Sequence, residues 1–295
     1  MKFNTFKSDF ILIFVAVIWG LAFVAQRIGM NHIGPFTFNG IRFILGGVSL
    51  LPIIILAPKS KKRQNSAGLI KSGIVAGFFL FCGISLQQVG LVYTTAGKAG
   101  FITGLYVVIV PVLNLFLKQD KTSFATWIGA LLASIGMFLL SVSKNMTMGF
   151  GDLLVLFSAF CFALHLLIIG RLSSRFDTAS LSLVQCIVCA LLSLAAAGIF
   201  ETFVIKDIMA VSIPLLYGGV LSVGVAYSLQ IYGQKNSPAS HAAIIFSLES
   251  VVAAIGGWII LNEILSRRAV AGCAIMLSGM LVSQIYSKKS GDIVS

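Results

Sequence analysis

Apolar residues along the chain form long runs, and short polar stretches that hold most of the charged side chains separate them. A helix needs about 20 apolar residues to cross a bilayer, and ten runs reach that length. Because the connections are short, we expect neighbouring helices to run antiparallel. The longest connection, 58–67, is basic and predicts a solvated loop. The ten predicted spans are 9–28, 36–57, 68–93, 95–117, 122–143, 151–171, 179–201, 209–233, 238–260 and 264–286.

Composition supports an all-α integral membrane protein. Hydrophobic residues make up 58% of the 295 positions and charged residues only 10%, whereas soluble domains have about 25% charged residues. The net charge of +12 does not indicate a nucleic-acid partner, because the basic residues lie between the apolar runs, where they contact lipid headgroups and set orientation. Cys186 and Cys189 have CxxC spacing without other ligand types nearby, so we expect packing residues and neither a metal nor a cofactor.

The distribution of Lys and Arg predicts the orientation in the membrane. If the N-terminus is cytoplasmic, most of these residues fall on the cytoplasmic side. The other side then holds only Arg27, Lys98, Lys144, Lys206, Arg267 and Arg268. The positive-inside rule therefore predicts a multi-pass protein of the cell (cytoplasmic) membrane with both termini in the cytoplasm.

The chain also repeats itself at an offset of 143 residues. SLQQVG (85–90) aligns with SLQIYG (228–233), and TAGKAGFITGLY (95–106) aligns with PASHAAIIFSLE (238–249). The same register pairs Asp9 with Asp152 and Gly136 with Gly279. Each half, 1–147 and 148–295, then holds five spans, so the second half enters the membrane inverted. Two inverted five-helix repeats are typical of secondary transporters, whose sites lie near the midplane. The first apolar run resembles a signal peptide, but its counterpart in the second repeat predicts that it is retained.

Several stretches carry a resemblance to a known family. They are AVIWGLAFVAQRIG (16–29), PFTFNGIRFILGG (35–47), TTAGKAGFITGLYVVIVPVL (94–113), SPASHAAIIFSLESVVAAIGGWIILNE (237–263) and AGCAIMLSGMLVS (271–283). With them the chain resembles the drug/metabolite transporter superfamily, in its ten-helix type with two EamA domains. The resemblance implies a carrier of small molecules such as amino acids, sugars or drugs, and export is its commoner theme. Where the family has Leu-Glu-Pro, this chain has Leu248-Glu249-Ser250.

Glu249 is the most unusual polar residue, because it lies near the middle of the ninth span. Ionisable groups at membrane depth mark a site or a charge pair. Glu249 therefore binds a cationic group of the substrate, couples proton movement to transport, or has a structural role. In the structural role it pairs with Arg42 or Lys98, or it is a protonated acid held by a hydrogen bond. Its repeat counterpart is Tyr106, in the middle of the fourth span, and the repeat axis is expected to bring the two together. Tyr106 offers a hydrogen bond or packs as an aromatic residue.

Other polar and aromatic residues inside the spans are candidates for the substrate path. Gln87 and Gln230 are counterparts that bind the substrate or join helices. His165 lies deep in the sixth span, where it shuttles protons or has a structural partner. Trp19 lies in mid-span, unlike most membrane Trp residues, which favours a cavity wall. Pro111, in the fourth span, is a candidate for bending its helix.

Three cationic or titratable residues complete the candidates for coupling or charge pairing with Glu249. Arg42, near the start of the second span, extends outward toward the interface or attracts an anionic group. Lys98 and His241 occupy equivalent positions at the starts of the fourth and ninth spans, where they gate or anchor.

The leading prediction is therefore a secondary active transporter that moves a small polar, amino-acid-like metabolite by alternating access, with export as the expected direction. Protons are the candidate coupling ion. The chain lacks a GxxxxGK[ST] loop, so ATP drive would need a separate subunit. A membrane enzyme is disfavoured because the spans hold neither HExxH nor paired aspartates. The alternative is a membrane receptor or assembly protein that transports nothing.

Overall fold

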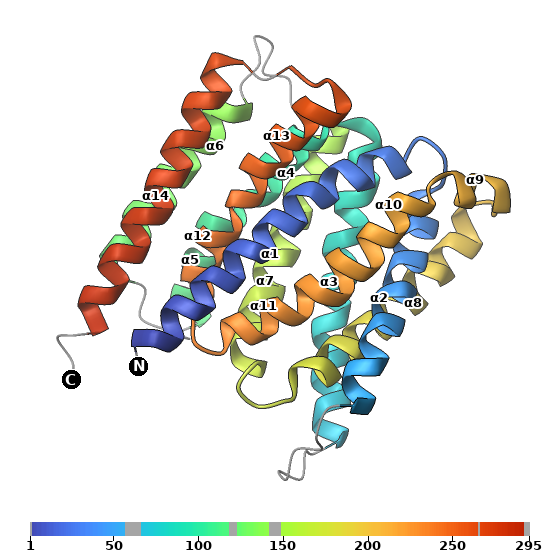
Figure 1. Cartoon of the computed structure of the whole chain (residues 1–295), viewed down its shortest axis with the longest axis horizontal. Coiled ribbons are helices and arrows are strands. Elements are labelled where there is room, and N and C mark those ends of the chain that lie inside the picture. Colours follow the sequence, from blue (N-terminus) through green and yellow to red (C-terminus); the bar gives the residue numbers. More distant parts are fainter. Residues whose placement is uncertain (1, 57–65, 118–122, 142–148, 265, 292–295) are drawn as a thin grey trace.

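The protein's computed structural model describes residues 2–56, 66–117, 123–141, 149–264 and 266–291. Within these ranges every regular element is a helix (Figure 1). This follows from the apolar runs, because a helix satisfies all its backbone hydrogen bonds internally where lipid offers none. The elements are α1 (Lys2–Gly29), α2 (Pro35–Leu56), α3 (Ser66–Tyr93), α4 (Ala96–Gly104), α5 (Tyr106–Leu117), α6 (Phe124–Ser141), α7 (Phe150–Leu172), α8 (Thr178–Phe200), α9 (Ile205–Ala210), α10 (Ser212–Leu216), the π-helix η1 (Tyr217–Ala226), α11 (Tyr227–Gln234), α12 (Ala239–Phe246), α13 (Leu248–Leu261) and α14 (Arg267–Gly291).

Eight helical segments of the described chain are long and apolar enough to cross a membrane. The predicted fifth and tenth spans correspond to α6, with a shorter apolar segment at Phe124–Leu139, and to α14, which packs along it (Figure 1). The predicted loop 58–67 lies almost wholly outside the described residues, as does the predicted boundary at 147/148. The all-helical multi-pass membrane fold is therefore confirmed. The eight segments are Phe6–Gly29, Pro35–Leu56, Ser66–Tyr93, Ala96–Leu117, Phe150–Leu172, Thr178–Phe200, Ser212–Gln234 and Ala239–Leu261.

Contacts between the two halves come in matched sets, as an inverted repeat requires. Helix α1 packs on α13, and its counterpart α7 packs on α4 and α5. Likewise α2 packs on η1 and α3 packs on α8, while the equivalent helices α2 and α8, and α6 and α14, pack on each other. Figure 1 shows the start of α1 and the end of α14 at the same end of the bundle. Helices of each half thus pack against helices of the other half along a shared interface.

Small residues allow these close contacts. A Cβ on Gly136 of α6 would lie 2.5 Å from the carbonyl oxygen of Gly272, and one on Gly279 of α14 would lie 2.8 Å from that of Gly129. Glycine removes the side chain that would separate the two backbones. Gly129 and Gly136 are seven positions apart, as are Gly272 and Gly279, so each pair lies on one face of its helix. Cys186 and Cys189 are buried on α8, as expected for packing residues.

The fourth and ninth spans are interrupted near their middles. Helix α4 ends at Gly104 and α5 begins at Tyr106, while α12 ends at Phe246 and α13 begins at Leu248. At each junction the backbone tightens: Leu105 N–H donates to Ile102 O at 3.2 Å, and Ser250 N–H donates to Ser247 O at 3.1 Å. Both bonds span three residues, as in a 3₁₀ turn. Pro111 was the candidate for the bend, but it lies inside α5, and the second interruption forms without any proline.

The eighth span is not a uniform α-helix. It begins at Ser212, three residues after the approximate predicted start, because Val211 has non-helical angles (φ −110°, ψ 24°) and separates the short α9 from α10. The middle of the span is the ten-residue π-helix η1. A π-helix changes which side chains point along one face, and such segments often occur at functional sites. This one faces α1 and α2.

Candidate functional site

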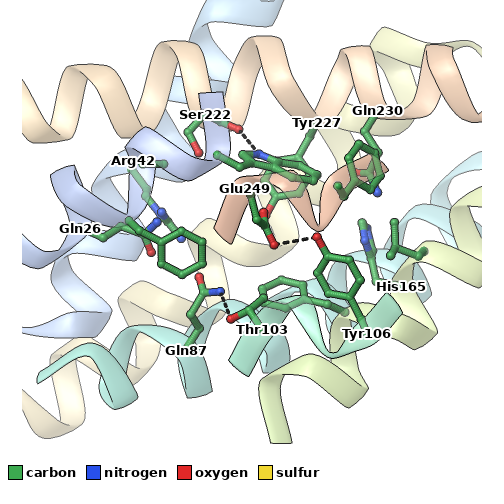
Figure 2. A pocket seen from close by; sticks show the side chains of 16 residues that line it. Gln26, Arg42, Gln87, Thr103, Tyr106, His165, Ser222, Tyr227, Gln230 and Glu249 are labelled. Carbon is green, nitrogen blue, oxygen red and sulfur yellow. Dashed lines mark hydrogen bonds between the residues drawn. The ribbon is translucent and has the colours of Figure 1, made fainter. Parts of the chain in front are cut away.

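A cavity of about 50 Å³ lies where the two repeats meet (Figure 2). Seven of the ten predicted spans contribute to its wall, whereas the fifth, seventh and tenth do not. The walls are aromatic and apolar, with polar groups set among them. All six residues predicted for the substrate path line it, and so does Arg42. The lining residues are Trp19, Ala22, Phe23, Gln26, Arg42, Gln87, Thr103, Tyr106, Phe162, His165, Leu166, Ser222, Tyr227, Gln230, Phe246 and Glu249.

Tyr106 and Glu249 join the repeats across this cavity. The Tyr106 hydroxyl donates to Glu249 Oε1 at 2.6 Å, and each residue is 3% exposed. Tyr106 is the first residue of α5, directly after the interruption, and Glu249 is the second residue of α13. A buried carboxyl group needs such a partner, because an unpaired one costs free energy. The contact expected from the repeat register is therefore present.

An aromatic wall stands beside this pair. The rings of Tyr227 and Phe246 each lie with their centroids 5.1 Å from that of Trp19. Trp19 Nε1–H donates to the carbonyl oxygen of Ser222 in η1 at 3.2 Å. The indole is thus fixed in mid-span by a backbone acceptor, which removes the usual reason for Trp to lie at the interface. Figure 2 shows Ser222 and Tyr227 above the Tyr106–Glu249 contact.

Gln87 and Gln230 occupy equivalent positions, but their partners differ. Gln87 Nε2 donates to Thr103 Oγ1 at 3.0 Å. Gln230 is 1% exposed, and neither its nitrogen nor its oxygen has a partner among the described residues. The buried Gln26 Oε1 also lacks a partner there. Buried amides without partners are costly, so Gln230 and Gln26 have capacity left for a ligand.

His165 lines the cavity and also contacts a residue of a neighbouring helix outside the cavity wall. One of its ring nitrogens, Nε2, lies 2.6 Å from Gln185 Oε1 of α8. Its ring meets that of Tyr227 edge-on, with centroids 6.2 Å apart. His165 therefore has the structural partner that one of its two interpretations required, while its ring still lines the cavity.

Arg42 enters the cavity from α2. It is 3% exposed, so the side chain does not extend outward to the interface, and that alternative is wrong. Its guanidinium carbon lies 5.8 Å and 5.4 Å from the ring centroids of Phe38 and Phe43. Among the described residues it forms neither a hydrogen bond nor an ion pair, and its Nε lacks a partner. The structural pairing of Glu249 with Arg42 is therefore absent.

Lys98 and His241 lie outside the cavity wall and have other partners. Lys98 Nζ lies 2.5 Å from Asp152 Oδ2, and His241 Nε2 lies 3.0 Å from Asp9 Oδ1. The Lys98–Glu249 pair among the predicted alternatives is thus replaced by Lys98–Asp152. The two observed pairs are equivalent in the repeat register, and each joins one repeat to the other.

Several lining residues escaped the sequence analysis, although signals for two of them exist. Gln26 follows Trp19 by seven positions, and Tyr227 precedes Gln230 by three, so each shares a helix face with a predicted residue. Thr103 and Ser222 have hydroxyl groups, which are common in membrane helices, and Phe246 is apolar, so none of the three stands out in the sequence. Their places follow from the interruptions and from η1, which the apolar pattern does not reveal.

A family model, described as the EamA-like transporter family, matches residues 6–142 and again 149–284. The two matches cover both repeats. A solved crystal structure shares the fold, with a TM-score of 0.78 over 96% of this chain and 98% of that chain at 18% identity. That likeness concerns the fold alone.

Similar proteins carry names of the same kind. An "Uncharacterized transporter" of Archaeoglobus fulgidus is 32% identical over 93% of this chain and 85% of its own length. YoaV of Bacillus subtilis, also named an uncharacterized transporter, is 22% identical over 92% of this chain and 94% of its own. A "Probable amino-acid metabolite efflux pump" of Salmonella typhimurium is 23% identical over 94% of both chains.

Proposed function

The chain belongs to the EamA-like transporter family and is a multi-pass membrane transporter, and from this premise we propose that it is a secondary carrier of a small polar, amino-acid-like metabolite. The carrier works by alternating access, and the cavity at Tyr106 and Glu249 is its substrate site. The observation that supports this most strongly is the 2.6 Å contact between repeat counterparts at the wall of the cavity. Two inverted repeats that meet at one central site can expose it to either side in turn.

The size of the cavity fits a closed form of such a carrier. At about 50 Å³ it has room for a few water molecules, whereas pockets that hold small ligands measure about 300–1,000 Å³. A metabolite therefore requires the helices around the cavity to separate. The interruptions next to Tyr106 and Glu249 supply points at which two of these helices can bend.

The two ion pairs between the repeats lie at opposite ends of the bundle. Alternation of the spans places the starts of α4 and α7 at one end and the starts of α1 and α12 at the other. Lys98–Asp152 joins the former and Asp9–His241 joins the latter. We propose that each pair holds one end shut and that only one pair parts at a time, which gives Lys98 and His241 the gating role rather than an anchoring one.

Glu249 has a direct role in this proposal. Its carboxyl group meets a cation in the cavity, either an ammonium group of the substrate or a proton that couples transport to the pH gradient. A carboxyl group held by one phenol retains further capacity to accept hydrogen bonds. Either use agrees with the rule that ionisable groups at membrane depth are functional.

Direction and orientation complete the proposal. The name of the Salmonella typhimurium relative, an amino-acid metabolite efflux pump, supports export. The excess of Lys and Arg on one side supports a location in the cell membrane with both termini in the cytoplasm.

Flux through the purified full-length protein tests the proposal. Vesicles reconstituted with it would be loaded in turn with labelled amino acids, nucleosides or sugars, and efflux measured with and without a pH gradient. We expect one amino-acid-like solute to leave faster than from protein-free vesicles. If no solute does so, the carrier proposal is wrong, and the receptor or assembly protein becomes the better interpretation.

A further inference from the structure

We propose that Arg42 is an anion-binding subsite of the cavity, and that the carried metabolite is a zwitterion whose carboxylate meets Arg42 and whose ammonium group meets Glu249. The apolar remainder of the metabolite packs on the aromatic wall. This inference rests on the proposed function and narrows its substrate class.

The unpaired state of Arg42 carries the argument. The other buried ionic or imidazole side chains of the described chain each have a polar partner. Asp9 pairs with His241, Asp152 with Lys98, Glu249 with Tyr106, and His165 with Gln185. Arg42, in contrast, has neither a hydrogen bond nor an ion pair among the described residues, and its guanidinium lies over the faces of two Phe rings. A buried charge without a counter-charge is costly, and guanidinium offers a fork of donors that matches a carboxylate. A bound carboxylate therefore supplies the missing partner.

The position of Glu249 indicates that the ligand is a zwitterion and not a simple anion. It reaches the same cavity from the other repeat, so both charges face one ligand (Figure 2). A purely anionic ligand would bring a negative charge towards the Glu249 carboxylate, which is unfavourable. A purely cationic ligand would leave Arg42 unpaired. A zwitterion pairs both groups, and the substrate then joins α2 of the first repeat to α13 of the second.

The rest of the cavity wall indicates what the uncharged part of the ligand is. Trp19, Tyr227 and Phe246 form an apolar surface beside the two charges. The unpartnered amide of Gln230 lies in the same wall. The three rings favour an apolar side chain over a sugar or phosphate group, because the many polar atoms of such a group would lose water and outnumber the few unpartnered amide atoms of the wall.

Matched ligands test the inference on the wild-type protein. Thermal stability of the purified full-length protein would be measured with leucine, with leucinamide, which lacks the carboxylate, and with isocaproate, which lacks the ammonium group. Phenylalanine, phenylalaninamide and hydrocinnamate form a second series. We expect at least one amino acid to raise the Tm, and both of its analogues to bind about 10- to 100-fold more weakly, because each loses a charge-assisted contact. The inference is overturned if an amide matches its amino acid, or if no zwitterion shifts the Tm.

Variants at Arg42 provide the second arm. We expect Arg42→Met to keep or raise the Tm without ligand, because it removes an unpaired buried charge, and to lose the ligand shift. Arg175→Met, which changes an exposed arginine, serves as the control and should keep the shift. A ligand shift that persists in Arg42→Met contradicts the inference. Flux measurements distinguish the zwitterion inference from the carrier proposal. If zwitterions bind but are not transported, only the carrier proposal is contradicted. If amines are transported and zwitterions are not, only the zwitterion inference is contradicted.

Discussion

The hydroxyl of Tyr106 donates a hydrogen bond of 2.6 Å to the carboxyl group of Glu249, and the two residues are 143 positions apart, the offset of the internal repeat. Each stands just after an interruption in its span. The contact thus lies where the two repeats meet. A carrier whose halves move against each other would change the geometry of this contact.

Tyr106→Phe removes the hydroxyl and leaves Glu249 without its partner. We expect flux at low substrate concentration to fall about 10- to 100-fold, since a buried hydrogen bond to a charged carboxylate is worth about 1.5–3 kcal/mol. Flux from reconstituted vesicles measures this. Tyr227→Phe, in the same wall, is the matched control, because no described residue hydrogen-bonds its hydroxyl. Equal losses in the two variants would show that the Tyr106–Glu249 bond has no special role.

Lys98→Ala breaks the ion pair with Asp152 at one end of the bundle. We expect that end to open more often. In a protein that also carries Ser222→Cys, the thiol should then react at least about fivefold faster with a membrane-impermeant maleimide added from that side. The measurement uses a background without the five native cysteines. Exchanging the partners, as Lys98→Asp with Asp152→Lys, should restore slow labelling.

Lys206→Ala is the control for this experiment, because Lys206 is exposed on α9. Unchanged labelling in Lys98→Ala would mean that the pair only anchors the helices. The same logic applies at the other end to His241→Ala, which should speed labelling from the opposite side.

Gly20→Ala tests the contact between the repeats behind Glu249. A Cβ on Gly20 would lie 2.7 Å from the carbonyl oxygen of Glu249, so α1 and α13 would have to move apart. We expect a loss of stability of about 1–3 kcal/mol, seen as a lower Tm. Gly198→Ala on α8 has no atom within 4 Å of the new Cβ, and should be neutral or stabilising by up to about 1 kcal/mol. If both variants have the same Tm, the close approach of the helices at Gly20 does not contribute to stability.

Much of the site could be predicted from the sequence, because polar residues inside a membrane span cost free energy and are therefore rare there. Trp19, Gln87 and Glu249 stood out against apolar surroundings, and the repeat register brought Tyr106 to Glu249. The partners of Lys98 and His241 were missed, although the register already paired Asp9 with Asp152. Those aspartates lie near helix ends, where charged residues are common in membrane proteins. Nothing in the sequence therefore indicated that they are buried and paired.

Backbone irregularities were beyond the sequence pattern. The π-helix from Tyr217 to Ala226 and the interruption at Ser247 contain no proline that would mark them. They depend on packing against the other repeat, as at Trp19, which donates to a carbonyl group of the π-helix. Apolar periodicity reports which residues avoid water, and it does not report how a helix is wound.

The most direct test of the carrier proposal is the flux of reconstituted Glu249→Gln, which keeps the size of the side chain and removes its charge and its proton. We expect transport to fall to the level of protein-free vesicles, or to lose all dependence on a pH gradient, while the variant still inserts and melts as a folded protein. Asp207→Asn on α9, away from the cavity, should transport like the wild type. Wild-type flux with unaltered pH dependence in Glu249→Gln would contradict the assignment of this cavity as the transport site.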